Sequence, residues 1–376
     1  MNNSRDITFA FQCSTATSAD EPKSDQTLYN EVIEDCRLGY ELGYEAAWMN
    51  EHHCSDYFPT PSPLLIFAAV AREVPDLGLG TMVLVLPWYH PLRLAGELSM
   101  LNQLTRGKLH IGLGRGTAKF EYDAFGVAMP EARDRFAEGI QLVRKALAGG
   151  KFEHQGKFFP QPHALELRPR PNGKEINFYG AIGSPPSAGI MGDLNLPPLL
   201  IPSFPPKLMT QMLNTWRERT LAAGGNVNAT LPMATTMLIA DTDAEALALG
   251  QRYLPRFFEL QCIHYDIANH PWDDIEGYQQ FSKIFANLQR YAREPESLAE
   301  YMRWHLIGSP ETVRRRIEEL ASFGFDYFVI GSNTPGVPKQ LQRESLARFA
   351  KEVAPKLSRS FGPPKASSKL KQRQAG

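Results

Sequence analysis

Short apolar runs alternate with amphipathic stretches along most of this chain. Residues 77–86 are almost wholly apolar, which is typical of a parallel strand covered on both faces. Pro87, His90 and Pro91 break this run and open a helical pattern, and a second apolar run covers residues 109–113. This stretch predicts a strand–helix–strand unit that ends in the glycine-rich sequence GLGRG.

The same alternation recurs before and after that unit. Strands are expected at residues 7–12, 46–49, 77–86, 109–113, 177–181, 199–201, 231–240 and 327–330. Helices are expected at residues 28–42, 61–72, 91–104, 131–147, 205–223, 309–323 and 340–357, with another that begins after Asp243. Eight strands alternating with helices predict an α/β fold of the (β/α)8 TIM-barrel type. An open doubly wound sheet is the alternative, and the strand count favours the barrel.

Two segments interrupt the alternation and are expected as insertions at the C-terminal face of the barrel. Residues 151–175 contain an alternating pattern around a glycine, which predicts a hairpin. Residues 259–304 are rich in aromatic residues and histidines without a clean period, so we interpret them as an excursion over the barrel mouth, either a lid or a subunit contact. The expected organisation is one barrel domain, residues 1–357, followed by a basic, disordered tail, residues 358–376.

Composition narrows the class of protein. The formal net charge of the 376-residue chain is −1, so no global field favours nucleic acid or a membrane surface. The four cysteines are widely spread and lack zinc-finger spacing, which is typical of a reducing compartment. The first residues lack signal-peptide features, and no apolar run approaches the ~18 residues of a membrane span. We therefore expect a cytoplasmic protein.

Two histidines follow the second expected strand. Adjacent residues of an extended chain point to opposite faces, so His52 and His53 cannot easily share one metal ion, and we expect no metal site. The imidazole pKa near working pH suits His52 to proton transfer. We assign His53 to the protein core.

Two further motifs indicate an anion. Arg115 lies between glycines after the fourth expected strand, where its planar guanidinium could bind a phosphate. GLGRGT lacks the third glycine of a dinucleotide-binding motif, and a tight turn with a surface arginine is an equal alternative. The sequence GSPPS, residues 183–187, opens a helix whose free amides could bind an anion or serve only as a cap. Together the two motifs favour a phosphorylated ligand.

Four segments carry a family resemblance: NEHH at 50–53, the long block at 80–116, EYDAFG at 121–126, and residues 308–331. They resemble the bacterial luciferase-like flavin monooxygenases. The resemblance implies an oxygenase that receives reduced FMN (FMNH2) from a separate NAD(P)H-dependent flavin reductase. It also implies O2 as co-substrate, a flavin C4a-hydroperoxide, and transfer of one oxygen atom to a small organic substrate. Many aromatic residues in the expected loops favour an apolar or heteroaromatic substrate.

The resemblance also implies roles for particular residues. His52 matches the active-site histidine, Arg115 matches the phosphate-binding arginine, and Ser184 and Ser187 match hydroxyls of the phosphate site. Met82 and Val83 match a strand bulge, often a non-prolyl cis peptide, that backs the flavin ring. The chain departs from luciferase at two positions: Gly114 replaces a reactive cysteine, and Gly183 replaces a glutamate but keeps the backbone amide.

Alternatives on the same fold remain open. One is an oxidoreductase that uses the deazaflavin F420, transfers hydride and does not use oxygen. Another is a non-catalytic flavin-binding subunit. Relatives in this family also imply a homodimer or a higher homo-oligomer.

Overall fold

The computed structural model describes residues 6–16, 21–201 and 204–364. Its centre is a parallel sheet in the order β10-β9-β11-β1-β2-β3-β4-β7-β8. The bounds are β1 Thr8–Gln12, β2 Ala46–Met49, β3 Gly78–Val85, β4 Leu109–Gly114, β7 Ile176–Ala181, β8 Pro198–Leu199, β9 Pro232–Ile239, β10 Leu306–Gly308 and β11 Tyr327–Gly331.

Backbone hydrogen bonds close this sheet into a barrel. The Leu200 amide, just after β8, donates to the Pro232 carbonyl over 3.2 Å, and the Ala234 amide of β9 donates to the Leu200 carbonyl over 2.8 Å. The predicted (β/α)8 barrel is therefore confirmed, and the open sheet is excluded. All eight expected strands are present within a residue or two. The short strand β10 is an addition that pairs with the last residues of β9.

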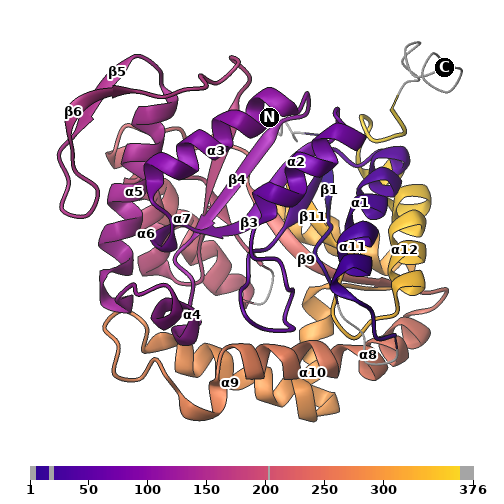
Figure 1. Cartoon of the computed structure of the whole chain (residues 1–376). Helices are drawn as coiled ribbons and strands as arrows, with labels where there is room; N and C mark the ends of the chain where they lie inside the picture. The colour runs from indigo at the N-terminus through magenta and orange to yellow at the C-terminus, as the bar shows by residue number, and fades with distance from the viewer. Residues whose placement is uncertain (1–5, 17–20, 202–203, 365–376) are drawn as a thin grey trace, which may run out of the picture.

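Helices surround the barrel, as Figure 1 shows. Serine hydroxyls begin four of them: Ser24, Ser62, Ser184 and Ser309 each accept a hydrogen bond from the backbone amide three residues later. The bounds of the surrounding helices are α1 Asp25–Leu42, α2 Pro63–Glu73, α3 Pro91–Leu104, α4 Lys119–Ala124, α5 Ala132–Leu147, α6 Pro185–Asp193, α7 Pro206–Ala222, α11 Pro310–Ser322, α12 Lys339–Arg348 and α13 Ala354–Leu357.

Three more helices cross the barrel mouth, along the lower edge of Figure 1. We call α8 (Asp243–His264), α9 (Gln280–Arg293) and α10 (Pro295–Trp304) the covering helices. The expected excursion is thus helical. The helical period of this segment is hidden in the sequence for two reasons. Pro255 lies inside α8. Aromatic residues of α9 contact both the cavity and their neighbours: Phe285 lines the cavity and stacks on Tyr265, with 4.9 Å between ring centroids.

The expected hairpin is also present, as β5 (Lys151–His154) paired antiparallel with β6 (Gln161–Glu166). The carboxylate of Glu138 on α5 fixes its turn by accepting hydrogen bonds from the amides of Lys157, Phe158 and Phe159. This insertion therefore lies beside the barrel wall, as Figure 1 shows, rather than over the mouth.

Beyond α13 the chain continues in contact with the barrel. Phe361 packs edge-on against Phe9 and Tyr44, at 5.8 and 5.4 Å between ring centroids. Residues 365–376, most of the expected tail, lie outside the described residues. Among the helices that are described, none has the length and apolar content needed to cross a membrane.

Gly331, the last residue of β11, tests how tightly the barrel closes. A Cβ atom there would lie 1.8 Å from the Thr235 carbonyl oxygen of β9, so backbone would have to move. We expect Gly331→Ala to destabilise the fold by about 3 kcal/mol or to prevent folding, the upper end of overpacking costs. Gly96→Ala is the matched control, because a Cβ there meets nothing within 4 Å and helix α3 should gain roughly 0.5–1 kcal/mol. Urea unfolding measures both, and equal effects would contradict this account.

Candidate active site

The carboxyl ends of the barrel strands and the covering helices enclose one cavity of about 600 Å³. Gln12, Val85, Gly114 and Ala181 line it at or near the ends of four strands, and Tyr301 of α10 lines it from above. All the residues singled out in the sequence lie on its wall: His52, Met82, Val83, Arg115, Gly183, Ser184 and Ser187. The structure thus brings these residues to one place, while their roles stay predictions.

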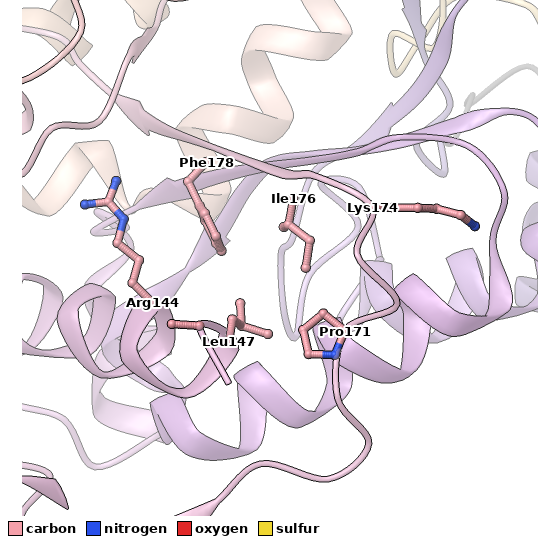
Figure 2. Close-up of a pocket in the computed structure, with 7 residues that line it drawn as sticks. Arg144, Leu147, Pro171, Lys174, Ile176 and Phe178 are labelled. Atoms are coloured by element: carbon pink, nitrogen blue, oxygen red, sulfur yellow. The ribbon is translucent and has the colours of Figure 1, made fainter. Parts of the chain in front are cut away.

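A second, smaller hollow of about 250 Å³ lies between α5 and the start of β7. Figure 2 shows Ile176 and Phe178 pointing toward the helix that carries Arg144 and Leu147. The Arg144 guanidinium donates to the Leu194 and Asn195 carbonyls, and the Lys174 ammonium donates to the Thr105 carbonyl. Because the Arg144 and Lys174 side chains already donate to backbone carbonyls, this hollow is better explained by packing than by ligand binding.

Strand β3 carries the irregularity that the resemblance implies. The peptide bond between Met82 and Val83 is cis, and the pairing of β3 with β4 shifts register between Thr81 and Leu84. A Cβ atom at Gly114 would lie 2.4 Å from a methyl carbon of Val83. A side chain at position 114 would therefore displace Val83 in this bulge.

Two arginines carry buried, unpaired nitrogens in the cavity wall. Within the described chain, Nη1 of Arg115 and Nε of Arg133 are buried without a hydrogen-bond partner. Burial lowers the pKa of Arg115, with a smaller contribution from the nearby Arg133. The Arg115 guanidinium also lies over the Tyr278 ring, 4.9 Å from its centroid. Such orphaned donors are costly unless an anion pairs with them, so the residues fit a phosphate.

The start of α6 supplies further donors. Ser184 is the N-cap, and its hydroxyl accepts from the Ser187 amide over 3.3 Å. The Ser187 hydroxyl in turn accepts from the amides of Gly183 and Ser184, over 3.1 and 3.0 Å. These hydrogen bonds form a helix cap, which is one of the two roles that the sequence predicts for residues 183–187. All three amides are engaged in the cap, and Pro185 and Pro186 have no N–H. An anion could therefore bind at this helix start by replacing the cap hydrogen bonds.

His52 lies on another part of the wall, and its imidazole ring packs against Tyr57 and His264, each 4.7 Å away between centroids. Burial holds the pKa of His52 well below its usual value, so its ring is neutral at neutral pH. His53 points elsewhere: its Nε2 lies 2.9 Å from Glu51, whose other oxygen accepts the Val85 amide. The two histidines thus separate, and His53 is partly buried beside Glu51 rather than in the core.

Several cavity residues were missed in the sequence. Arg133 lies in the first turn of α5, and Glu121, on α4, accepts the His53 amide over 2.7 Å. Burial raises the pKa of Glu121 to about 7. Charged residues on amphipathic helices are usually solvent-facing, which is why neither residue stood out.

The wall formed by the covering helices is mainly aromatic, with a small polar group at one end. Thr236 of β9 pairs its hydroxyl with that of Tyr301 over 2.8 Å, and its amide donates to His305 Nδ1 over 2.9 Å. Burial lowers the pKa of His305 to about 3, so this ring is neutral. The aromatic members of the wall include Phe257, Phe258, Tyr265, Phe281, Phe285 and Tyr291.

Solved structures with the same fold include flavin enzymes. The crystal structure of monooxygenase RslO1 from Streptomyces bottropensis superposes with a TM-score of 0.77 at 24% identity, covering 93% of this chain and 99% of that one. The oxygenating constituent of 3,6-diketocamphane monooxygenase from Pseudomonas putida, in complex with FMN, superposes with a TM-score of 0.74 at 21% identity, covering 94% and 99%. At these identities the likeness concerns the fold.

Among curated proteins, a segment of 144 residues is 35% identical to the oxygenase component of the flavin-dependent trigonelline monooxygenase of Acinetobacter baylyi. It covers 38% of this chain and 40% of that protein, so the match spans less than half the length of the relative. The family model of luciferase-like monooxygenases matches residues 8–327. Because this match spans most of the chain, the protein belongs to the luciferase-like monooxygenase family.

Proposed function

We propose that this protein is the FMN-dependent oxygenase component of a two-component monooxygenase. The observation that carries the proposal is Nη1 of Arg115, which is buried without a partner among the described residues, in a cavity of about 600 Å³ at the barrel mouth. A cavity of that size is in the range of small-molecule sites, and a buried guanidinium needs an anionic partner. Family membership and the FMN-bound structural relative support a flavin phosphate as that anion.

In this proposal Arg115, with Arg133 nearby, pairs with the phosphate, and the α6 start donates from Gly183, Ser184 and Ser187. Met82 and Val83 back the flat ring system. When bound, reduced FMN supplies the two electrons with which O2 is split between the substrate and water. The neutral imidazole of His52 would donate a hydrogen bond from its ring N–H or accept a proton at its other ring nitrogen from the reacting groups. The covering helices exclude water from the reaction.

The proposed function also implies a reductase and a substrate as partners. The relative's name, "oxygenase component", supports a separate NAD(P)H-dependent flavin reductase as the source of FMNH2. The aromatic wall with its neutral threonine, tyrosine and histidine favours a small organic substrate with an aromatic or heteroaromatic ring. Cys13, Cys36, Cys54 and Cys262 are free thiols, which supports a cytoplasmic location. A homodimer or higher homo-oligomer completes the proposal.

Anaerobic mixing followed by oxygen separates this function from its alternatives. We expect the protein to bind FMNH2, and after O2 is added, the oxidised-flavin absorbance to recover more than tenfold more slowly than for free FMNH2. Reduced F420 should give no turnover without oxygen. Turnover of reduced F420 under anaerobic conditions would favour the hydride-transfer alternative. Recovery at the rate of free flavin would favour a subunit without activity.

A further inference from the structure

Three potential metal ligands meet beside the cavity from separate parts of the chain. His52 follows β2, Glu121 lies on α4, and His264 is the last residue of α8. One ligand atom from each, an imidazole nitrogen or a carboxylate oxygen, lies within 4.8 Å of the other two. Two imidazoles with one carboxylate form a common donor set of zinc sites that keep a fourth position open.

His264 is the member of this cluster whose contacts point to a missing ligand. Its Nε2 is buried without a hydrogen-bond partner in the described part of the chain, and lies 3.7 Å from a Glu121 oxygen. Its other ring nitrogen, Nδ1, lies 2.7 Å from the Ser55 hydroxyl. Metal-binding histidines are typically fixed through the second ring nitrogen in this way. A cation between Nε2 and the carboxylate would satisfy both groups.

The charge states of the cluster agree with this arrangement. Burial lowers the pKa of His264 to about 4 and holds that of His52 well below its usual value, so both imidazoles keep a lone pair free at neutral pH. Burial also disfavours the charged form of Glu121 and raises its pKa to about 7. A divalent cation would compensate a charge that the surroundings otherwise oppose.

We propose that His52, Glu121 and His264 bind one divalent transition-metal ion of the zinc class, with the open coordination position facing the cavity. Nitrogen donors favour such an ion over magnesium or calcium. Ligand atoms around tetrahedral zinc are separated by about 3.4 Å, given bond lengths near 2.1 Å. Nε2 of His264 and its Glu121 partner are close to that separation at 3.7 Å, and since all three ligand atoms lie within 4.8 Å of one another, small side-chain shifts would complete the site.

One consequence of the metal site rests on the proposed function. A metal ion that takes the lone pair of His52 removes the nitrogen assigned to the proton in the oxygenation reaction. We therefore expect zinc to inhibit the oxygenase, and His264→Ala to raise the inhibitory zinc concentration at least tenfold.

Metal titration of the full chain, freed of metal with a chelator and dialysed, tests the site directly. Zn²⁺ is followed by calorimetry and Co²⁺ by its visible absorption. We expect one ion per chain, and binding at least about a hundredfold weaker in His264→Ala, since even outer-shell changes cost about 10–100-fold. His163→Ala is the matched control, because His163 lies exposed on β6, and it should bind as the wild type does. Glu121→Gln, which keeps the side-chain volume, should weaken binding similarly and guards against misfolding of the alanine variant.

Equal zinc affinity in wild type and both cluster variants would overturn the site, as would absence of binding to the wild type. FMN binding is measured on the same samples. Because His264 is not among the residues that line the cavity, His264→Ala should keep the wild-type affinity for FMN. Failure of the wild type to bind FMN would contradict the proposed function and leave the metal result to be judged separately.

Discussion

Replacing Arg115 with alanine is expected to weaken FMN binding by about ten- to a hundredfold. A hydrogen bond to a charged group contributes about 1.5–3 kcal/mol, and each 1.4 kcal/mol is a factor of ten in affinity. The guanidinium is buried against the Tyr278 ring, and its Nη1 has no hydrogen-bond partner within the described chain. Arg133, the other arginine of the cavity wall, retains part of the phosphate binding. Fluorescence titration of the purified protein with FMN measures the loss.

Two other arginine variants control for charge and for folding. Arg115→Lys keeps the charge but not the planar fork, and it should fall between wild type and alanine. Arg144→Ala removes an arginine of the second hollow, whose guanidinium donates to two backbone carbonyls. It should lower the free energy of unfolding and leave FMN affinity unchanged. If Arg115→Ala binds FMN as tightly as wild type, the phosphate is not bound at this residue.

His52→Ala is expected to uncouple oxygen consumption from substrate oxidation. Loss of a positioned acid–base group typically lowers the rate of the catalysed step about 10²–10⁴-fold. In this protein the slowed step would be the transfer of oxygen to the substrate. Oxygen should still be consumed with FMNH2, but it should appear as hydrogen peroxide. The measurement is the ratio of oxidised product to peroxide at equal FMNH2 supply, once a substrate that turns over has been found.

The neighbouring histidine supplies the matched control. His53→Gln changes a ring that contacts Glu51 and is not among the residues lining the cavity, so it should keep the wild-type product ratio. An unchanged ratio in His52→Ala would remove His52 from the oxygenation step. Parallel loss in both variants would point to a disturbed loop rather than to a lost proton-transfer group.

The barrel could be predicted because its strands are buried on both faces and its helices on one. Continuous apolar runs and amphipathic stretches are local patterns, and capping serines such as Ser309 mark where helices begin. Strand β10 was missed because its three residues, Leu306–Gly308, are too few to show a recognisable apolar run. The start of α8 was predicted, but α9 and α10 were not recognised as helices because their aromatic residues have contacts on more than one side.

The residues of the candidate site fall into two groups, those that local sequence patterns could place and those that they could not. Residues that directly follow strands, such as His52, Arg115 and Ser184, could be placed at the barrel mouth from the sequence, because the fold gathers those ends. Glu121, Arg133 and His264 could not, since each lies on a helix and only the three-dimensional packing turns it inward. Glu121 in particular reaches His264 from a segment far away in the sequence, so no local pattern pairs the two residues.

The covering helices form one continuous segment between β9 and β10, outside the repeating strand–helix units. Under the proposed function, most groups that hold the flavin belong to the barrel loops, whereas the aromatic wall facing the substrate belongs to this segment. Cofactor retention and substrate choice are then encoded in largely separate stretches of the gene. Replacing residues 243–304 with the matching segment of a relative is then expected to change which substrate is accepted, provided that Tyr278, which packs on Arg115, is kept.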